Sequence, residues 1–302
     1  MRLSVEDLDF SYGNSKVLDG ISFDLEGQGL TCIIGPNGVG KSTLVKCLDG
    51  INKPTGGRIS IDGRDIASIP PRELAKLMAF VPVVSGDMFS MTVFDTVMMG
   101  RRPHQRLGNI SSLDKEIVRR TLNMMGIRDL SMRGSNELSA GQHQRMVIAR
   151  GLAQTPRFLL LDEPTANLDA RHQIQVTMTL RDLASRGGMS VVMISHDLNI
   201  ASRFADRIVM MAPPGVVRAI GRPEEVITEN SIRDVYGVDC SIVDVRGRPH
   251  VILLDPIRCS GKSCFRLGGP VLGRPVFSSC AGRSDRSTRH RSVRLRIAAS
   301  CQ

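Results

Sequence analysis

The residues in this sequence with the clearest capacity for chemistry form one short glycine-rich stretch. Its spacing matches G-x-x-x-x-G-K-S, and its members are Gly35, Pro36, Asn37, Gly38, Val39, Gly40, Lys41, Ser42 and Thr43. In this pattern the backbone N–H groups of a tight turn cradle phosphate oxygens, the lysine reaches the outer phosphates and the serine hydroxyl binds Mg²⁺. We therefore expect residues 35–43 to bind phosphate, with Ser42 as a Mg²⁺ ligand.

The segments on either side of this stretch are those that such a loop requires. Residues 30–34 are a short apolar run with β-branched members, which predicts a buried strand. Residues 44–48 have the spacing of a short helix. A helix that begins directly after the turn adds partial positive charge where the phosphates would lie. The context therefore favours a phosphate-binding loop over an ordinary glycine-rich turn.

Two further apolar runs end in polar residues. Residues 158–161 lead into Asp162 and Glu163, and residues 190–194 lead into Ser195 and His196. The carboxyl ends of parallel strands meet at one edge of a sheet, where ligands bind in open α/β folds. We expect Asp162, Glu163 and His196 to lie at the same edge as the phosphate loop.

The remaining pattern predicts an α/β fold. Residues 2–12 and 17–25 alternate as strands of an antiparallel sheet, and residues 58–63 alternate as an edge strand. From about residue 85 to 155 the periodicity is helical. Within it, one helix is expected from residue 113 to 125, with Leu113, Ile117, Thr121 and Met124 on its apolar face.

The bulk properties divide the chain in two. The sequence has 302 residues and a formal charge of +10, but residues 258–302 hold ten Lys and Arg against one Asp, so residues 1–257 are nearly neutral. We expect no nucleic acid to bind this body. No run of about 18 apolar residues occurs, and the N-terminus lacks an apolar signal core, which predicts a cytoplasmic protein.

Residues 258–302 are rich in Arg, Ser, Gly and Cys and have no sustained period, which predicts a disordered tail. The sequence leaves its role open. One interpretation is a recent or accidental extension, including a shifted reading frame. The others are a basic arm that contacts anionic lipid or nucleic acid, and a fragment of a linker. We expect the domain to span residues 1–257.

Three motifs in this order resemble those of the ATP-binding cassette (ABC) ATPases. They are the phosphate loop at residues 35–43, Leu-Ser-Ala-Gly-Gln at 138–142, which is similar to the family signature, and Leu-Leu-Leu-Asp-Glu-Pro at 159–164. The resemblance extends over residues 1–255. It implies a phosphate-loop NTPase sheet of the ABC type with an antiparallel β subdomain and a helical subdomain at about 85–155, and ATP with Mg²⁺ as cofactors.

The resemblance also implies a role for each matching residue. Two subunits would pair head to tail, and each ATP would lie between one phosphate loop and the opposing signature. Asp162 would hold Mg²⁺ through water, Glu163 would polarise the attacking water and His196 would contact the γ-phosphate. Tyr12 would stack on the base, and Asp169 would contact the nucleotide from a segment similar to the D-loop (residues 166–169). The remaining nucleotide contacts would come from the signature residues Ser139, Ala140, Gly141 and Gln142. Tyr12 is equally consistent with an ordinary strand end.

Within the family, residues 89–104 resemble the importers of iron–siderophore, haem and cobalamin. In that group this segment meets the coupling helices of the membrane subunits. The resemblance implies an integral membrane permease, a substrate-binding protein that acts through it, and a place at the cytoplasmic face of the membrane. A soluble ABC ATPase of DNA repair or translation is the alternative, but such chains usually carry a coiled-coil insertion or two cassettes. A homodimer and a pair with a different ATPase subunit both remain open.

The sequence departs from the family pattern at three positions. Val83 stands where a glutamine usually supplies an oxygen to Mg²⁺ and couples the nucleotide site to the permease, and valine has no donor or acceptor. Ser85 lies nearby. Ala140 replaces a common glycine, and His143 follows the signature where glutamine or arginine is usual. These departures suggest an ATPase, or a nucleotide-gated subunit, that binds ATP well but turns over slowly.

Overall fold

The computed structural model describes residues 2–83, 91–105, 109–166 and 168–257. All of them belong to one unit, Met1–Arg258. The expectations for the tail at 258–302, and the parts of the predictions that concern Ser85, residues 89 and 90 and Asn167, lie outside the described residues. In the part of the chain that is described, no helix has the length and apolar character needed to cross a bilayer.

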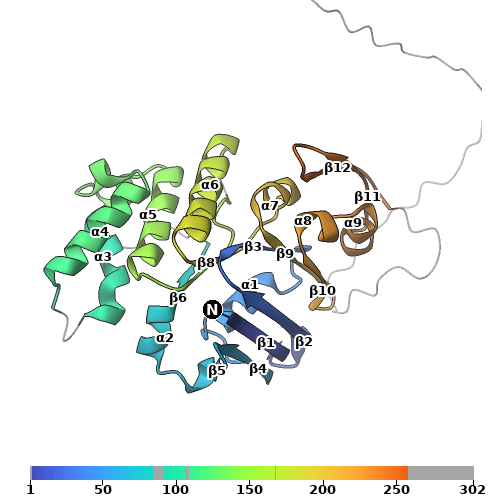
Figure 1. Ribbon diagram of the computed structural model, residues 1–302, viewed down its shortest axis with the longest axis horizontal. Coiled ribbons are helices and arrows are strands. Elements are labelled where there is room, and N and C mark those ends of the chain that lie inside the picture. The colour runs from blue at the N-terminus through green and yellow to red at the C-terminus, as the bar shows by residue number, and fades with distance from the viewer. Residues whose placement is uncertain (1, 84–90, 106–108, 167, 258–302) are drawn as a thin grey trace, which may run out of the picture. The chain divides into compact units, whose positions relative to one another are not determined.

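A six-stranded sheet lies at the centre of the fold (Figure 1). Its strand order is β10 (Val216–Gly221), β9 (Arg207–Ala212), β3 (Gly29–Ile34), β8 (Ser190–Ile194), β7 (Phe158–Leu161) and β6 (Met78–Val81). All neighbours pair in parallel except β10, which is antiparallel to β9. The central strands are buried on both faces, which explains their unbroken apolar runs.

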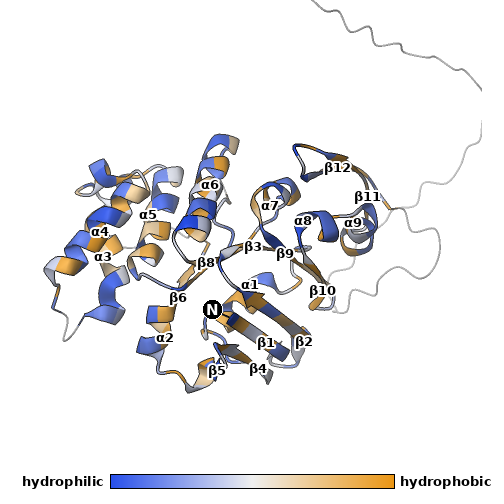
Figure 2. Cartoon of the chain, in the orientation of Figure 1, coloured by the Kyte–Doolittle hydropathy of each residue, from blue (hydrophilic) through white to orange (hydrophobic). Residues whose placement is uncertain are grey.

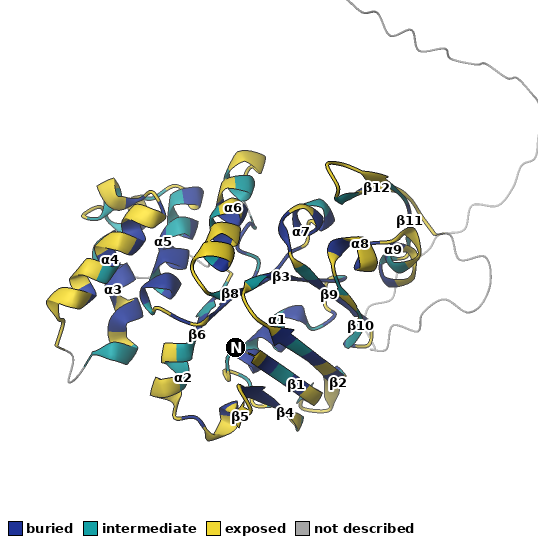
Figure 3. Cartoon of the chain, in the orientation of Figure 1, coloured by how far each residue is buried: buried dark blue, intermediate teal, exposed yellow. Residues whose placement is uncertain are grey.

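Alternate residues of these strands enter two separate cores. In β8, Val191 and Met193 belong to one apolar cluster, whereas Val192 and Ile194 belong to the other. This follows from the two-residue period of a strand, which sends successive side chains to opposite faces. The apolar interior and its burial are visible in Figures 2 and 3.

The core that includes Val192 is closed by a second, antiparallel sheet and by α1 (Lys41–Leu48). The strands of this sheet run in the order β2 (Ser15–Glu26), β1 (Arg2–Tyr12), β4 (Gly56–Ile61) and β5 (Arg64–Asp65). Leu3 pairs with Leu25 and Val5 with Phe23, and all four side chains are buried. The alternating pattern therefore places one face of this sheet against the phosphate-loop strand and helix.

The other core is covered by helices. The sequence segment between β6 and β7 supplies α3 (Val93–Met98), the 3₁₀ helix η2 (Met99–His104), α4 (Ser112–Met124), two short turns η3 (Arg128–Leu130) and η4 (Ser135–Glu137), and α5 (Ala140–Ala153). Next along the chain come α6 (Ala170–Arg186) and α7 (Leu198–Phe204). The smaller elements are η1 (Ile66–Ser68), α2 (Pro71–Leu77), α8 (Pro223–Val226), α9 (Glu229–Tyr236) and the hairpin of β11 (Val238–Asp244) and β12 (Pro249–Pro256).

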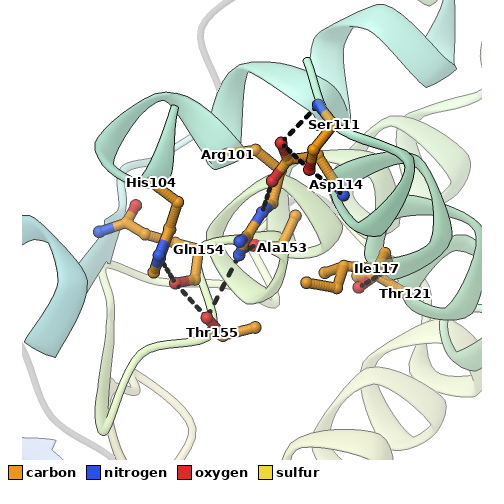
Figure 4. Close-up of polar contacts among 9 residues, drawn as sticks. All are labelled: Arg101, His104, Ser111, Asp114, Ile117, Thr121, Ala153, Gln154 and Thr155. Atoms are coloured by element: carbon orange, nitrogen blue, oxygen red, sulfur yellow. Dashed lines mark hydrogen bonds and ion pairs between the residues drawn. The ribbon is translucent and has the colours of Figure 1, made fainter. Parts of the chain in front are cut away.

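A buried ion pair fixes η2 to two neighbouring helices (Figure 4). The guanidinium of Arg101 donates to Asp114 Oδ1 at 2.9 Å, and both side chains are almost fully buried. Arg101 Nη1 also donates to the carbonyl of Ala153, the last residue of α5, at 2.7 Å. Burial raises the pKa of Asp114, but the hydrogen bonds from Arg101 and Ser111 outweigh it, so the pKa lies below its usual value.

The α/β fold class is confirmed, but the predicted apolar face of the helix at 113–125 is only partly right, since Thr121 is buried and Leu113 and Met124 are not. Leu113 and Met124 are 60% and 54% exposed, and the buried side of α4 carries Asp114, Val118, Thr121 and Leu122. The buried side has helical spacing of its own through Val118, Leu122 and Met125. The Arg101–Asp114 pair explains why a carboxylate shares that side, since its charge has a buried cationic partner.

Candidate functional site

The loop between β3 and α1 has a backbone that its glycines make possible. Gly35 has φ +150°, and a Cβ atom there would lie 2.4 Å from the carbonyl oxygen of Met211. A side chain at this position is therefore excluded by the neighbouring strand β9. The loop ends where α1 begins at Lys41, so the first N–H groups of that helix face the same space.

Lys41 holds the loop from inside. Its Nζ atom donates to the carbonyls of Gly35 and Pro36, both at 2.8 Å, and the side chain is buried. Burial lowers the pKa of Lys41, while the nearby charges of Glu163 and Asp162 raise it. The ammonium group therefore already lies next to the loop residues that are expected to meet phosphate.

The end of β7 brings a carboxylate to the start of α1. The Ser42 hydroxyl donates to Asp162 Oδ1 at 2.9 Å. Burial raises the pKa of Asp162, and the hydrogen bond from Ser42 opposes this shift. A hydroxyl and a carboxylate oxygen side by side are the hard ligands that Mg²⁺ takes, together with water and substrate phosphates. The residues present therefore fit a magnesium ion, although the described residues hold no cluster of three or more His, Cys, Asp and Glu for a metal.

Glu163 and His196 form the second polar pair. His196 Nε2 donates to Glu163 Oε1. The hydrogen bond joins the segment after β7, which carries Glu163, to the segment after β8, which carries His196. Glu163 has φ +49°, a left-handed conformation that is unusual for a residue with a side chain. Backbone strain of this kind is concentrated at functional sites, where the surrounding structure holds it in place.

These groups surround one cavity of about 420 Å³. Its lining combines loop residues, both members of the Glu163–His196 pair and one residue of β2, and consists of Val17, Asn37, Gly38, Gly40, Lys41, Ser42, Thr43, Glu163 and His196. Asp162 adjoins it through Ser42. The structure thus brings together the phosphate loop and all three strand-end residues singled out in the sequence.

The Leu-Ser-Ala-Gly-Gln motif lies elsewhere in the chain. Ser139 caps α5, and Ser139 and Gln142 form a capping box in which the Ser139 N–H donates to Gln142 Oε1 at 3.0 Å. Ala140 and Gly141 form the first turn of the same helix. None of these four residues lines the 420 Å³ cavity. Within one chain, the structure does not bring the motif to the phosphate loop.

Asp169 and Tyr12 also lie outside the cavity lining. Asp169 caps α6 by accepting from the His172 N–H at 2.9 Å, and this bond, with one from the His172 ring, lowers the pKa of Asp169. Tyr12 ends β1 with 55% of its surface exposed, its ring edge-on to Phe10 at 4.8 Å between centroids, and its hydroxyl accepting from Asn52. Its side chain is therefore partly open to solvent.

Sequence reasoning missed two residues near these sites. Val17 lines the cavity from β2, and nothing in the alternation of that strand distinguished it from its neighbours. His172 contacts Asp169 and faces Gly141, where an added Cβ would lie 3.3 Å from the His172 ring. His172 lies three residues after the helix cap Asp169, and this spacing was the signal available in the sequence.

Val83, which stands where the family usually has a glutamine, lies two residues after the end of β6 and is 39% exposed.

Comparisons with known proteins agree with this geometry. The ABC transporter family matches residues 18–166. An uncharacterised ABC transporter ATP-binding protein of Methanocaldococcus jannaschii is 41% identical over 252 residues, which cover 83% of this chain and 98% of the relative. A hemin import ATP-binding protein of Bordetella avium is 38% identical, and the match covers 80% of this chain and 95% of the relative. A probable siderophore transport system ATP-binding protein of Bacillus subtilis is also 38% identical, and the match covers 80% of this chain and 87% of the relative.

The similarity extends to solved structures. An inward-facing structure of a putative metal-chelate type ABC transporter aligns with a TM-score of 0.73 and 28% identity, over 83% of this chain and 96% of the other. The relatives and this structure match the body of the chain over nearly their whole length.

Proposed function

This chain belongs to the ABC transporter family of ATP-binding proteins, and from that premise we propose that it binds and hydrolyses ATP to power import of an iron–siderophore, haem or cobalamin-like solute through a separate permease. One observation carries the ATPase part: Ser42, Asp162, Glu163 and His196 come together at the phosphate loop. The choice of solute class rests on relatives named for siderophore, hemin and cobalamin import.

The described groups divide the work of phosphoryl transfer. The loop N–H groups and Lys41 bind the β- and γ-phosphates, while Ser42 and Asp162 hold Mg²⁺, which neutralises phosphate charge when it is bound. Glu163 polarises and orients the attacking water. His196 holds the Glu163 carboxylate in place through its hydrogen bond, and because it lines the cavity it would contact the γ-phosphate. Tyr12, whose side chain is partly open to solvent, would stack on the base.

We propose that the site is completed by a second subunit. Ser139, Ala140, Gly141 and Gln142 sit at the start of a 14-residue helix, where N–H groups and the helix dipole favour an anion, yet they are not part of their own chain's cavity. In a head-to-tail homodimer they would meet the γ-phosphate bound by the partner, and Asp169 would lie at the same interface. The single chain is then expected to be nearly inactive.

The proposed permease contact lies on the helical side of the domain. Met91 and Met99 are exposed large apolar residues near α3, and adaptable methionine surfaces suit docking of a partner helix. Arg101 connects this segment to the carbonyl end of α5, whose other end begins at the signature. A push on η2 by a membrane subunit would therefore be transmitted along α5 to Ser139. On this proposal the chain would act at the cytoplasmic face of the membrane, and a substrate-binding protein would act through the permease.

Val83 supports a second candidate, a nucleotide-gated subunit with weak turnover. Its side chain is partly exposed two residues after the end of β6 and has no oxygen to offer a metal or a water. The arrangement of Glu163 and His196 favours hydrolysis, so we rank this candidate second. A soluble ABC ATPase without a transport partner is the third.

Phosphate release by the purified chain tests the proposal. The rate per subunit should rise with protein concentration, since each site needs two subunits, and Glu163→Gln should lower it about 100-fold or more while ATP still binds. Co-purification of the chain with a polytopic membrane protein from its own cells would separate a transport subunit from a soluble ATPase. An intact chain that binds ATP without measurable hydrolysis at any concentration would leave the nucleotide-gated candidate.

A further inference from the structure

A second hollow, far from the phosphate loop in sequence, is lined by positive charge. It lies where α6, α7 and the β11–β12 hairpin meet, elements that Figure 1 shows on the helix-covered side of the central sheet, and its volume is about 690 Å³. Its lining has four arginines, one histidine and no acidic residue, and the basic members are Arg181, Arg203, Arg246, Arg248 and His250.

The walls of this basic hollow are held rigidly. The Asn199 amide on α7 accepts from the Val251 N–H at 2.7 Å and donates to the Val251 carbonyl at 3.2 Å. Ser202, one turn further along α7, donates to the Pro249 carbonyl. These bonds fix β12 to α7, so Arg248 and His250 are carried by a backbone that is already in place. A ligand would meet a preorganised surface.

Little in the described structure neutralises these charges. The guanidinium groups of Arg181 and Arg246 have no hydrogen bond or ion pair to any described residue, and the only side-chain bond to Arg181 is the one that its backbone carbonyl accepts from Ser185. The Arg203 guanidinium lies over the Phe204 ring at 5.0 Å from its centroid. Arg248 donates to the Ala205 carbonyl at 3.1 Å and has one carboxylate, Glu224, at 3.9 Å. Gathering like charges around a hollow destabilises the fold, and an anion bound there would remove that cost.

We propose that this hollow binds a small organic anion that carries at least two phosphate or carboxylate groups. The planar guanidinium groups of Arg181, Arg246 and Arg248 match the bidentate geometry of both groups. The apolar side chains of Ile174, Ile200 and Phe204 provide contact area for the body of the ligand. The tail at 258–302 has a net charge of +9 and is therefore the wrong sign to occupy the site.

The location gives the bound anion a physical consequence. α6 begins at its cap Asp169, and α7 begins at its cap Asp197, directly after His196. An anion held by Arg181 on α6 and Arg203 on α7 would join two helices whose N-terminal ends adjoin Asp169 and His196, both assigned to the ATP site. Binding to the folded state alone must also raise the melting temperature.

The test uses the full chain with its phosphate loop saturated by ADP in a Mg²⁺-free buffer, because both probes chelate Mg²⁺, so that the added probe reports on the second site. Inorganic tripolyphosphate and citrate serve as the phosphate and carboxylate probes, and binding is measured by calorimetry and by the shift in melting temperature at fixed ionic strength. We expect at least one probe to bind, and Arg181→Gln/Arg246→Gln to lower its affinity tenfold or more. Neither guanidinium has a described partner, so this variant should fold normally.

The matched control is Arg119→Gln/Arg128→Gln, which removes the same charge from exposed positions on α4 and η3. It should keep the affinity of the original chain. The proposal is overturned if neither probe binds, or if the control variant loses as much affinity as the Arg181/Arg246 variant, because binding would then follow net charge alone. The readout does not involve hydrolysis, so its outcome is independent of the proposed function.

Discussion

The Ser42 hydroxyl at the start of α1 donates a hydrogen bond of 2.9 Å to the Asp162 carboxylate at the end of β7, across 120 positions of sequence. This contact joins the loop that is expected to hold phosphate to the strand end that supplies the acidic residues. The parallel order β3, β8, β7 produces it, since all three strands deliver their carboxyl ends to one edge.

Removal of either member of this pair should weaken magnesium-dependent hydrolysis. We expect Ser42→Ala and Asp162→Asn each to lower kcat/KM about 100-fold, about 2.7 kcal/mol of transition-state stabilisation. Because the two residues act together, the double variant should lose much less than the product of the single losses. Phosphate release titrated with Mg²⁺ measures this. Ser185→Ala on α6 is the control, and additive losses would mean that the two residues act separately.

Val83→Gln should raise the rate of hydrolysis. A glutamine there supplies the amide oxygen that valine lacks, and we expect a gain of about tenfold, which corresponds to about 1.4 kcal/mol. Val83→Leu is the matched control, because it changes size without adding an oxygen. Steady-state phosphate release on the three proteins decides the question. Equal rates for Val83 and its glutamine variant would remove the idea that this position limits turnover.

The Arg101–Asp114 pair should matter for stability far more than surface pairs do. Asp114→Ala leaves the Arg101 guanidinium buried without its counter-charge, and we expect a loss of about 3–5 kcal/mol in the free energy of unfolding. The exposed Arg58–Glu6 pair is the comparison, where Glu6→Ala should cost less than about 1 kcal/mol. Urea unfolding monitored by circular dichroism measures both. Similar costs at the two positions would contradict the buried-pair interpretation.

Asp49 should make stability depend on pH. It caps the C-terminal end of α1, and burial raises the pKa of its carboxyl to about 7. The unfolded chain releases this proton near pH 4 and the folded chain only near 7, so the stabilisation is present below about pH 4 and is lost as the pH rises through 7. Asp49→Asn should flatten the fall in melting temperature between pH 4 and 8. Asp129→Asn, at an exposed position, is the control and should leave the slope unchanged.

Deletion of residues 258–302 should leave ATP binding and the melting temperature of the body unchanged. Among the described residues, both apolar clusters are built from positions before 257, and the 420 Å³ cavity is lined by residues between 17 and 196. Nucleotide titration and thermal unfolding of the shortened chain are the measurements. A shortened chain that fails to fold would show instead that the tail is part of the domain.

Local patterns in the sequence determined much of this protein. The G-x-x-x-x-G-K-S spacing identified the phosphate loop, and the apolar runs before Asp162 and Ser195 identified β7 and β8. Both signals are short-range, because a tight turn needs glycine at fixed positions and a buried parallel strand needs apolar residues throughout. The order of the three motifs along the chain was enough to identify the family.

Only the tertiary structure decided which distant residues meet. The buried position of Asp114 depends on Arg101, which lies on another element and gives the carboxylate a partner inside the core. The basic hollow collects Arg181, Arg203 and Arg248 from two helices and a hairpin, and no periodicity in the sequence connects them. Periodicity reports which face of an element is apolar, whereas charge pairing and the packing of separate elements are set by contacts between residues far apart in the chain.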